Sequence, residues 1–196
     1  MQDQKREKTK RAILLMALGL VLVALAGSLF AYNYVIDKRA GEAARKTVES
    51  AKEKIDAGDY TANSDGEKTI IIDGYEYIGT VSVPSLDIEL PVLSEWSKQK
   101  LKISPCRYSG SILDGSLIIC GHNYQNHFGK LKYAENGDVV IITDATGTDY
   151  KYKISSVSLV NGDDVEQMKN NDGWDMTLFT CDYSGRHRIM LRCVRA

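Results

Sequence analysis

The sequence predicts a mainly β domain, a closed or nearly closed barrel of about eight short strands, behind an N-terminal transmembrane helix. Two observations predict this arrangement. An uncharged apolar run covers residues 12–36, and residues 67–196 contain short β-type runs separated by glycine and other turn residues. Short strands at regular spacing, with little helical signal between them, are typical of barrels and sandwiches.

The apolar run is long enough to span a membrane. Its 25 residues are mostly Leu, Ala, Val and Ile, and at about 1.5 Å per residue they cross a hydrocarbon core of roughly 30 Å. Basic residues precede the run, namely Lys5, Arg6, Lys8, Lys10 and Arg11. Because such a flank stays cytoplasmic, we expect a cytoplasmic tail over residues 1–11, a single-pass anchor over 12–36 and the rest of the chain outside the cell.

A cleaved signal peptide is the alternative interpretation of this run. The segment 24–27, Ala-Leu-Ala-Gly, resembles a small-residue cleavage site. However, the apolar region of a signal peptide usually spans only about 7–15 residues. The length therefore favours an uncleaved anchor.

Between the anchor and the β domain the composition changes twice. Residues 38–45 and 51–55 are rich in Ala, Glu, Lys and Arg, and residues 58–66 are polar with glycine at both ends. Good helix formers without an apolar face predict an exposed helical stalk, followed by a linker. We therefore expect the stalk and linker over residues 37–66 and one domain over 67–196. The net charge of −1 argues against nucleic-acid binding, which usually requires a strongly basic domain.

The β domain begins with a hairpin signal. The runs 69–72 and 75–78 flank Asp73-Gly74, a pair of residues typical of two-residue hairpin turns. The other strands are predicted over 77–83, 86–93, 116–120, 138–143, 150–160, 176–180 and 188–194, with a break at Pro84-Ser85. Only 94–101 and 129–134 look weakly helical.

Cys181 is the first candidate for chemistry. It ends the run Met176-Thr-Leu-Phe-Thr180 and is followed at once by the turn residues Asp182 to Gly185. A thiol at the end of a strand lies at the edge of a sheet, and a reactive thiol also needs a base nearby. The other cysteines, Cys106, Cys120 and Cys193, show no zinc-type spacing. We expect Cys120 and Cys193 to be core residues, although Cys120 could also be a second thiol near the site.

His122 is the best candidate for the base, because it follows the strand that ends at Cys120 and opens a polar loop, Gly121-His-Asn-Tyr124. His127 and His187 are the alternatives. A Cys–His pair performs acyl transfer when a donor also stabilises the oxyanion. Arg188 begins the last apolar strand and could be that donor; a surface arginine is the simpler interpretation, and Arg186 is a second candidate.

These residues resemble a family. The run Thr177-Leu-Phe-Thr-Cys181 matches the sortase signature Thr-Leu-x-Thr-Cys, and Gly121-His122 and Arg188 resemble the sortase histidine and arginine in the same order along the chain. The resemblance covers about residue 75 to the C-terminus. It implies an eight-stranded sortase-type barrel behind an N-terminal anchor, with Cys181, His122 and Arg188 as catalytic residues.

The resemblance also implies the reaction. Such an enzyme of the Gram-positive cell surface cleaves a sorting signal of the Leu-Pro-x-Thr-Gly type through a thioacyl intermediate. An amine, either a peptidoglycan precursor or a pilin lysine, then accepts the protein. Some sortases bind calcium, but Asp163, Asp164 and Glu166 are expected to form a solvated loop, because residues 97–107 offer no further carboxylate. No metal and no cofactor are therefore expected, and no substrate-binding residue is assigned.

The alternatives differ in what resolves the intermediate. A pilin-joining sortase uses a lysine, and a surface cysteine peptidase uses water. A non-catalytic anchored binding module, with Cys181 inert, is a third alternative.

Overall fold

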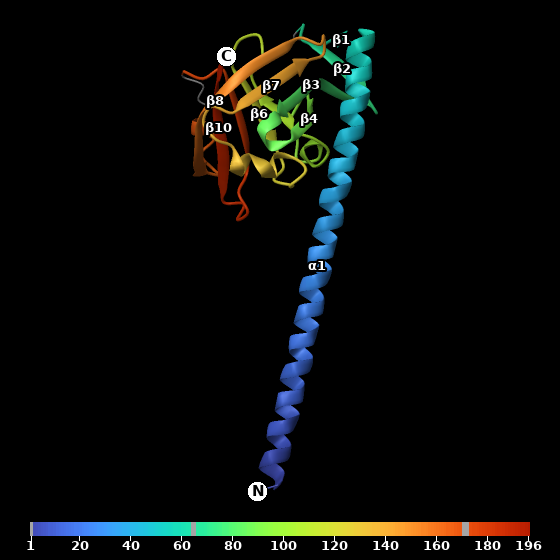
Figure 1. The fold of residues 1–196 in the computed structure, drawn as a ribbon, viewed down its shortest axis with the longest axis vertical. Helices are drawn as coiled ribbons and strands as arrows, with labels where there is room; N and C mark the ends of the chain where they lie inside the picture. Colours follow the sequence, from blue (N-terminus) through green and yellow to red (C-terminus); the bar gives the residue numbers. More distant parts are fainter. Residues whose placement is uncertain (1, 64–65, 170–172) are drawn as a thin grey trace. The chain divides into compact units, whose positions relative to one another are not determined.

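The structure, a computed structural model, describes residues 2–63, 66–169 and 173–196. The chain divides into two compact units, Met1–Lys38 and Arg39–Ala196. The helix α1 (Gln2–Ala57) runs through the first unit and into the second (Figure 1).

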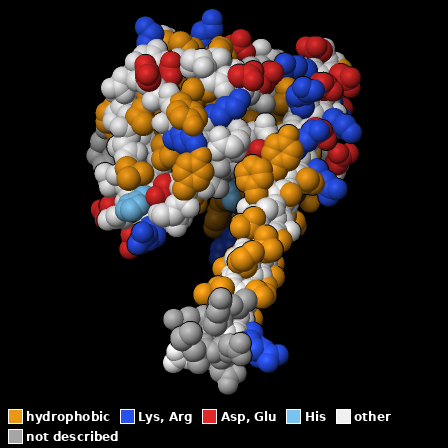
Figure 2. All heavy atoms as spheres, turned by 60° about the horizontal axis from the view of Figure 1, so that its bottom comes forward, with side chains coloured by type: hydrophobic (Ala, Val, Ile, Leu, Met, Phe, Trp, Pro, Cys, Tyr) orange, Lys and Arg blue, Asp and Glu red, His pale blue; other side chains and the backbone are white. Residues whose placement is uncertain are grey.

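The first unit is helical and apolar on its surface. It contains an 18-residue stretch of the helix with a mean hydropathy of 2.7, and none of this stretch is buried. Its large hydrophobic side chains are exposed, for example Leu14, Leu22 and Phe30 at 70%, 58% and 74%. Figure 2 shows many hydrophobic side chains on the surface of this helix. A helix of this length and composition can cross a membrane.

The second unit is a closed barrel, as the sequence predicts. Its wall consists, in order, of β3 (Tyr75–Val83), β4 (Ile88–Leu93), β5 (Cys106–Ser109), β6 (Leu117–Gly121), β9 (Met176–Cys181), β10 (His187–Arg195), β8 (Asp149–Asn161) and β7 (Val139–Asp144). The strand β7 pairs back onto β3, which closes the ring of eight strands. Full closure leaves no unpaired edge in the ring.

Two further strands extend from β3 outside the ring. The strand β2 (Lys68–Ile72) pairs with β3, and β1 (Thr61–Ala62) pairs with β2. The β2–β3 turn is the predicted hairpin, since Ile72 pairs with Tyr75 and the two residues between them, Asp73 and Gly74, have φ values of 50° and 79°. Positive φ at both central residues is the geometry that suits this turn.

The core has two parts, which lie on the two faces of the wall formed by β6, β9 and β10. Along these strands, Ile119, Leu178 and Leu191 belong to one buried cluster, while Cys120, Phe179 and Met190 belong to the other. Successive side chains of a strand point to opposite faces. The second face leads to the strand ends at which the candidate residues lie.

The last turns of α1 belong to the second unit and pack against the rest of it. Ala44, Val48 and Ala51 are buried at the spacing of one helix face. Lys52 also pairs with Glu89 of β4 at 2.7 Å. This part of the helix is therefore amphipathic, and the expectation of an exposed stalk without an apolar face is wrong for it, because Ala44, Val48 and Ala51 are buried.

Several elements differ from the prediction. The strand β5 was not predicted, because it is short, has a single pairing with β4 and a register shift against β6, and so leaves no alternating pattern. Among the described residues, 3-10 helices occur at η1 (Pro84–Leu86), η2 (Lys100–Lys102) and η3 (Phe128–Tyr133), of which η3 falls on the stretch 129–134 that looks weakly helical in the sequence. The short α2 (Val165–Lys169) lies in the segment between β8 and β9 and was not expected either.

Candidate active site

The strand register brings the three predicted residues to one edge of the wall. In the parallel pair β6–β9, Gly121 lies opposite Thr180. His122 directly follows Gly121, and Cys181 directly follows Thr180, so the two residues lie at the same end of neighbouring strands. In the antiparallel pair β9–β10, Arg188 lies directly opposite Cys181. By strand alternation, Cys181 and Arg188 face the same side as Phe179 and Met190.

The junction before His122 is closely packed. Thr180 Oγ1 donates to the Gly121 carbonyl at 2.9 Å, which joins the ends of β6 and β9. A Cβ at Gly121 would lie 2.4 Å from the Phe128 ring, so only glycine lets η3 approach this strand end. A larger residue in place of the glycine before His122 would clash with Phe128.

The imidazole of His122 is half-buried and held on two sides. Its Nδ1 lies 3.2 Å from Asn123 Oδ1 and 3.1 Å from the Asn123 backbone N. Its ring stacks on Tyr124, with centroids 4.0 Å apart and 6° between the planes. Both contacts with Asn123 involve Nδ1, and neither involves Nε2.

The loop after β6 is tied to the turn after Cys181. Asn123 Nδ2 donates to the Asp182 carbonyl at 3.1 Å, and Gln125 Nε2 donates to the Tyr183 hydroxyl at 3.0 Å. Lys132 of η3 hydrogen-bonds to the same hydroxyl and lies 4.3 Å from the Tyr183 ring centroid. This contact lowers the pKa of Tyr183 and raises that of Lys132.

Cys181 differs from the other three cysteines in its exposure. All four are free thiols, but only Cys181 is half-buried, while Cys106, Cys120 and Cys193 are buried. Burial raises the pKa of Cys106 and of Cys193 to about 12 and also raises that of Cys120. The expectation that Cys120 and Cys193 are core residues is confirmed.

Arg188 lies at the right register position, with its guanidinium directed at the turn. Its Nη1 donates to the Gly185 and His187 carbonyls, both at 3.0 Å. The group packs over Gly162, where a Cβ would lie 2.7 Å from Nη1. Arg186 lies in the turn before β10, outside this register.

The two rival histidines occupy other environments. His127 is fully buried, with its ring edge-on to Tyr124 at 5.6 Å. His187 Nδ1 lies 3.3 Å from Asp182 Oδ2. Hydrogen bonds from Ser184, followed by those from His187, lower the pKa of Asp182 to about 2. Asp182 therefore accepts hydrogen bonds within its own turn.

A cavity lies further along the face that carries Cys181. It has a volume of about 480 Å³ and is lined by Ser94, Glu95, Trp96, Arg107, Tyr108, Ser109 and Gly110. An aromatic row connects it to the Cys181 strand, because Phe179 packs edge-on to Tyr108 at 5.4 Å and Tyr108 packs edge-on to Trp96 at 5.8 Å. No local pattern in the sequence predicts this row.

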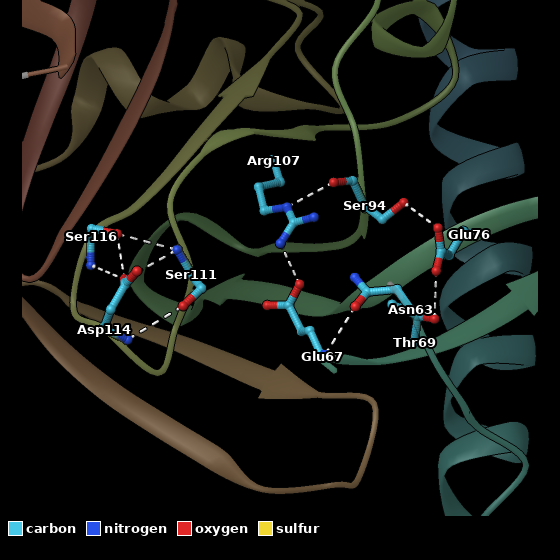
Figure 3. A network of polar contacts seen from close by, with 9 residues as sticks. All are labelled: Asn63, Glu67, Thr69, Glu76, Ser94, Arg107, Ser111, Asp114 and Ser116. Atoms are coloured by element: carbon cyan, nitrogen blue, oxygen red, sulfur yellow. Dashed lines mark hydrogen bonds and ion pairs between the residues drawn. The ribbon is translucent and has the colours of Figure 1, made fainter. Parts of the chain in front are cut away.

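A polar network supports the wall of this cavity (Figure 3). Arg107 Nε donates to the Ser94 carbonyl at 2.7 Å, and its Nη1 forms an ion pair with Glu67. The two side chains of this pair are only 16% and 12% exposed. Glu76 accepts hydrogen bonds from Thr69 at 2.7 Å and from Ser94 at 2.9 Å. Residues in β2 and just before it therefore contact, directly or through Glu76, two residues that line the cavity, Ser94 and Arg107.

Among the residues that the structure describes, no group of three or more His, Cys, Asp or Glu side chains could hold a metal ion. Of the acidic residues considered above, Asp164 accepts a hydrogen bond from the Gln167 backbone N at 2.9 Å. This contact is typical of a residue at the start of a helix.

Comparisons with known proteins find similar sequences and similar folds. The family model of the sortase domain matches residues 81–196. Sortase A of Bacillus anthracis is 25% identical over 181 residues, which cover 87% of this chain and 84% of that protein. Among solved structures, sortase C1 of Streptococcus agalactiae superposes with a TM-score of 0.57 at 26% identity, covering 64% of this chain and 70% of that one. Sortase A of Corynebacterium diphtheriae gives a TM-score of 0.57 at 23% identity, covering 62% and 61%.

Proposed function

The chain belongs to the sortase family of cysteine transpeptidases, and on this premise we propose that it cleaves a sorting signal of the Leu-Pro-x-Thr-Gly type at the cell surface and transfers the protein to an amine of the cell wall. The single observation that carries the proposal is the register that gathers His122, Cys181 and Arg188 at one edge of the barrel. The half-buried thiol there contrasts with three buried ones.

In the first half of the proposed reaction, the Cys181 thiolate attacks the scissile carbonyl carbon and a tetrahedral oxyanion forms. The Arg188 guanidinium, turned from the carbonyls that it now contacts, stabilises that charge. His122 gives a proton from Nε2 to the leaving amine as the C–N bond breaks. A thioester on Cys181 remains, and the C-terminal part of the signal leaves.

In the second half, an amine attacks the thioester carbonyl. His122 Nε2 takes the proton of the incoming amine, and the C–S bond breaks to release the amide product and the thiolate. The enzyme returns to its starting protonation state. No metal or cofactor takes part in this scheme.

The aromatic row and its cavity suit an extended peptide. Phe179, Tyr108 and Trp96 offer apolar contact along a path that begins two residues before Cys181. The cavity of about 480 Å³ has room for side chains of the signal. We therefore propose that the sorting signal lies along this row, with its scissile bond at Cys181.

We propose the topology that the sequence predicts, with residues 1–11 in the cytoplasm, 12–36 across the membrane, 37–66 as an outer stalk and linker, and the catalytic domain of residues 67–196 outside the cell. The apolar helix supports a single-pass anchor. The basic flank supports the orientation. Accessibility of cysteines to an impermeant thiol reagent on intact cells tests it, because Cys181 is then labelled without lysis.

The test of the reaction is amine dependence. The protein is incubated with a Leu-Pro-x-Thr-Gly peptide, with and without an oligoglycine or a lysine-bearing pilin peptide. The products are identified by mass spectrometry. An amide-linked product is expected with the wall-type amine. Joining only to the lysine peptide would favour the pilin-joining alternative, and hydrolysis alone in all mixtures would identify a peptidase.

A further inference from the structure

We infer that Asn123 is a positioning residue for His122, one that holds the imidazole in both of its protonation states and fixes it relative to the Cys181 turn. The inference rests on the proposed function, in which His122 must donate a proton and then accept one. It concerns a side chain next to the histidine, for which the sequence analysis proposed no role.

The orientation of the Asn123 amide follows from its partners. Its Nδ2 lies 3.1 Å from the Asp182 carbonyl oxygen, which can only accept a hydrogen bond. The NH2 group must therefore face Asp182. The carbonyl oxygen Oδ1 is then the atom left to face His122 Nδ1, at 3.2 Å.

Asn123 consequently offers Nδ1 both an acceptor and a donor. When Nδ1 carries a proton, it donates to Oδ1 at 3.2 Å. When Nδ1 is unprotonated, its lone pair accepts from the Asn123 backbone N–H at 3.1 Å. Asn123 thus gives Nδ1 a partner in either tautomer. Because the proton leaves and returns at Nε2, the bond from Nδ1–H to Oδ1 persists through both halves of the reaction and no rotation of the ring is required.

Two further contacts fix the plane and the place of the ring. Tyr124 stacks on it at 4.0 Å, which opposes rotation out of the plane. The bond from Asn123 to Asp182 spans 59 positions in sequence and joins the His122 loop to the residue directly after Cys181. Because the base follows β6 and the nucleophile ends β9, this bridge constrains the separation between them.

The side-chain acceptor also determines which nitrogen exchanges protons with substrate. With Nδ1–H held by Oδ1, Nε2 carries the second proton in the imidazolium and the lone pair in the neutral ring. That is the tautomer that can receive a proton from the incoming amine. Without Oδ1, the backbone N–H remains the partner of Nδ1 and favours the neutral tautomer with its proton on Nε2, which cannot receive one there.

Three variants of the full-length protein in detergent test the inference. Asn123→Leu has a similar size but lacks both side-chain bonds. Asn123→Asp keeps an acceptor for Nδ1–H, but it loses the bond to Asp182 and adds a negative charge beside the ring. Gln125→Ala is the matched control, since it removes a contact between the same loop and turn without touching His122.

Two readouts are needed, namely kcat and KM for transpeptidation and the nitrogen NMR signals of the imidazole in histidine-labelled protein. The chain has 3 histidines, so His122→Gln assigns the signals. We expect Asn123→Leu to lower kcat by about 10- to 100-fold with little change in KM, and to reduce the fraction of neutral His122 that carries its proton on Nδ1. Asn123→Asp should restore most of that fraction, and Gln125→Ala should leave both readouts near those of the unaltered protein.

The inference is overturned if Asn123→Leu lowers kcat no more than Gln125→Ala does, or if it leaves the His122 tautomer unchanged while the melting temperature is retained. Failure of the proposed function has a different signature, because the unaltered protein would then form no amide product. The NMR comparison still decides the role of Asn123 in that case.

Discussion

The edge of the barrel and the interior behind it use the same residue types for different purposes. Cys120 and Cys181 lie on neighbouring parallel strands, yet Cys120 is 2% exposed, with its pKa raised by burial, while Cys181 is half-buried at a strand end. Arginine shows the same contrast, since Arg107 forms an ion pair with Glu67 whereas Arg188 donates to the Gly185 and His187 carbonyls. We therefore propose that position at a strand end distinguishes the catalytic cysteine and arginine from the structural ones.

The largest expected effect at the edge is that of Cys181→Ala. Loss of the nucleophile should lower kcat/KM for transpeptidation by about a thousandfold or more, with the melting temperature almost unchanged. Cys193→Ala is the interior counterpart, and it should destabilise the fold by about 1–2 kcal/mol while kcat/KM stays within about twofold. A product assay and a denaturant titration on both variants check this. Comparable activity in the two variants would contradict the claim that the cysteine at the strand end is catalytic and the interior cysteine is structural.

Arg188→Ala should have the next largest effect. Removal of a charge-stabilising donor typically costs about 100- to 1,000-fold in kcat, and we expect a loss of that order. The matched control is Arg186→Ala, two residues away in the turn, for which a change of less than about threefold is expected. Steady-state kinetics with a sorting peptide measures both. Equal losses of kcat in the two variants would contradict a specific role of Arg188 in stabilising the oxyanion.

In the interior, Glu67→Gln should reduce stability more than activity. It leaves the Arg107 guanidinium without its ion partner at a site where both side chains are largely buried, so the free energy of unfolding should fall by about 3 kcal/mol. Glu95→Gln breaks an exposed pair with Lys100 and should cost less than about 1 kcal/mol. Urea titrations of the two variants, with kcat and KM alongside, make the comparison. A smaller loss for Glu67→Gln than for Glu95→Gln would contradict the assigned role of the network.

Much of the fold could be predicted from local sequence. The Asp73-Gly74 hairpin and the alternating strands each carry their signal within a few residues, and Cys181 and His122 could be selected because each follows an apolar run and precedes polar turn residues. The strand β5 could not be predicted, because its pairing is irregular and depends on neighbours distant in sequence.

The parts of the site that the sequence did not reveal depend on distant contacts. The Glu67–Arg107 pair spans 40 positions, and the row of Phe179, Tyr108 and Trp96 is formed by three separate segments. Asn123 was visible as a polar neighbour of His122, but its bridge to Asp182 exists only after β6 and β9 pair. Periodicity and turn residues report on local structure and cannot report on such pairs.

The most direct test of the central claim is the intact mass of the protein after brief incubation with a sorting peptide and no amine. Thioester formation predicts a mass increase equal to the N-terminal part of the peptide, located on the peptide fragment that contains Cys181 and lost when an amine is added. An unmodified Cys181 in protein that nevertheless cleaves the peptide, or the adduct on Cys106, Cys120 or Cys193, would contradict it.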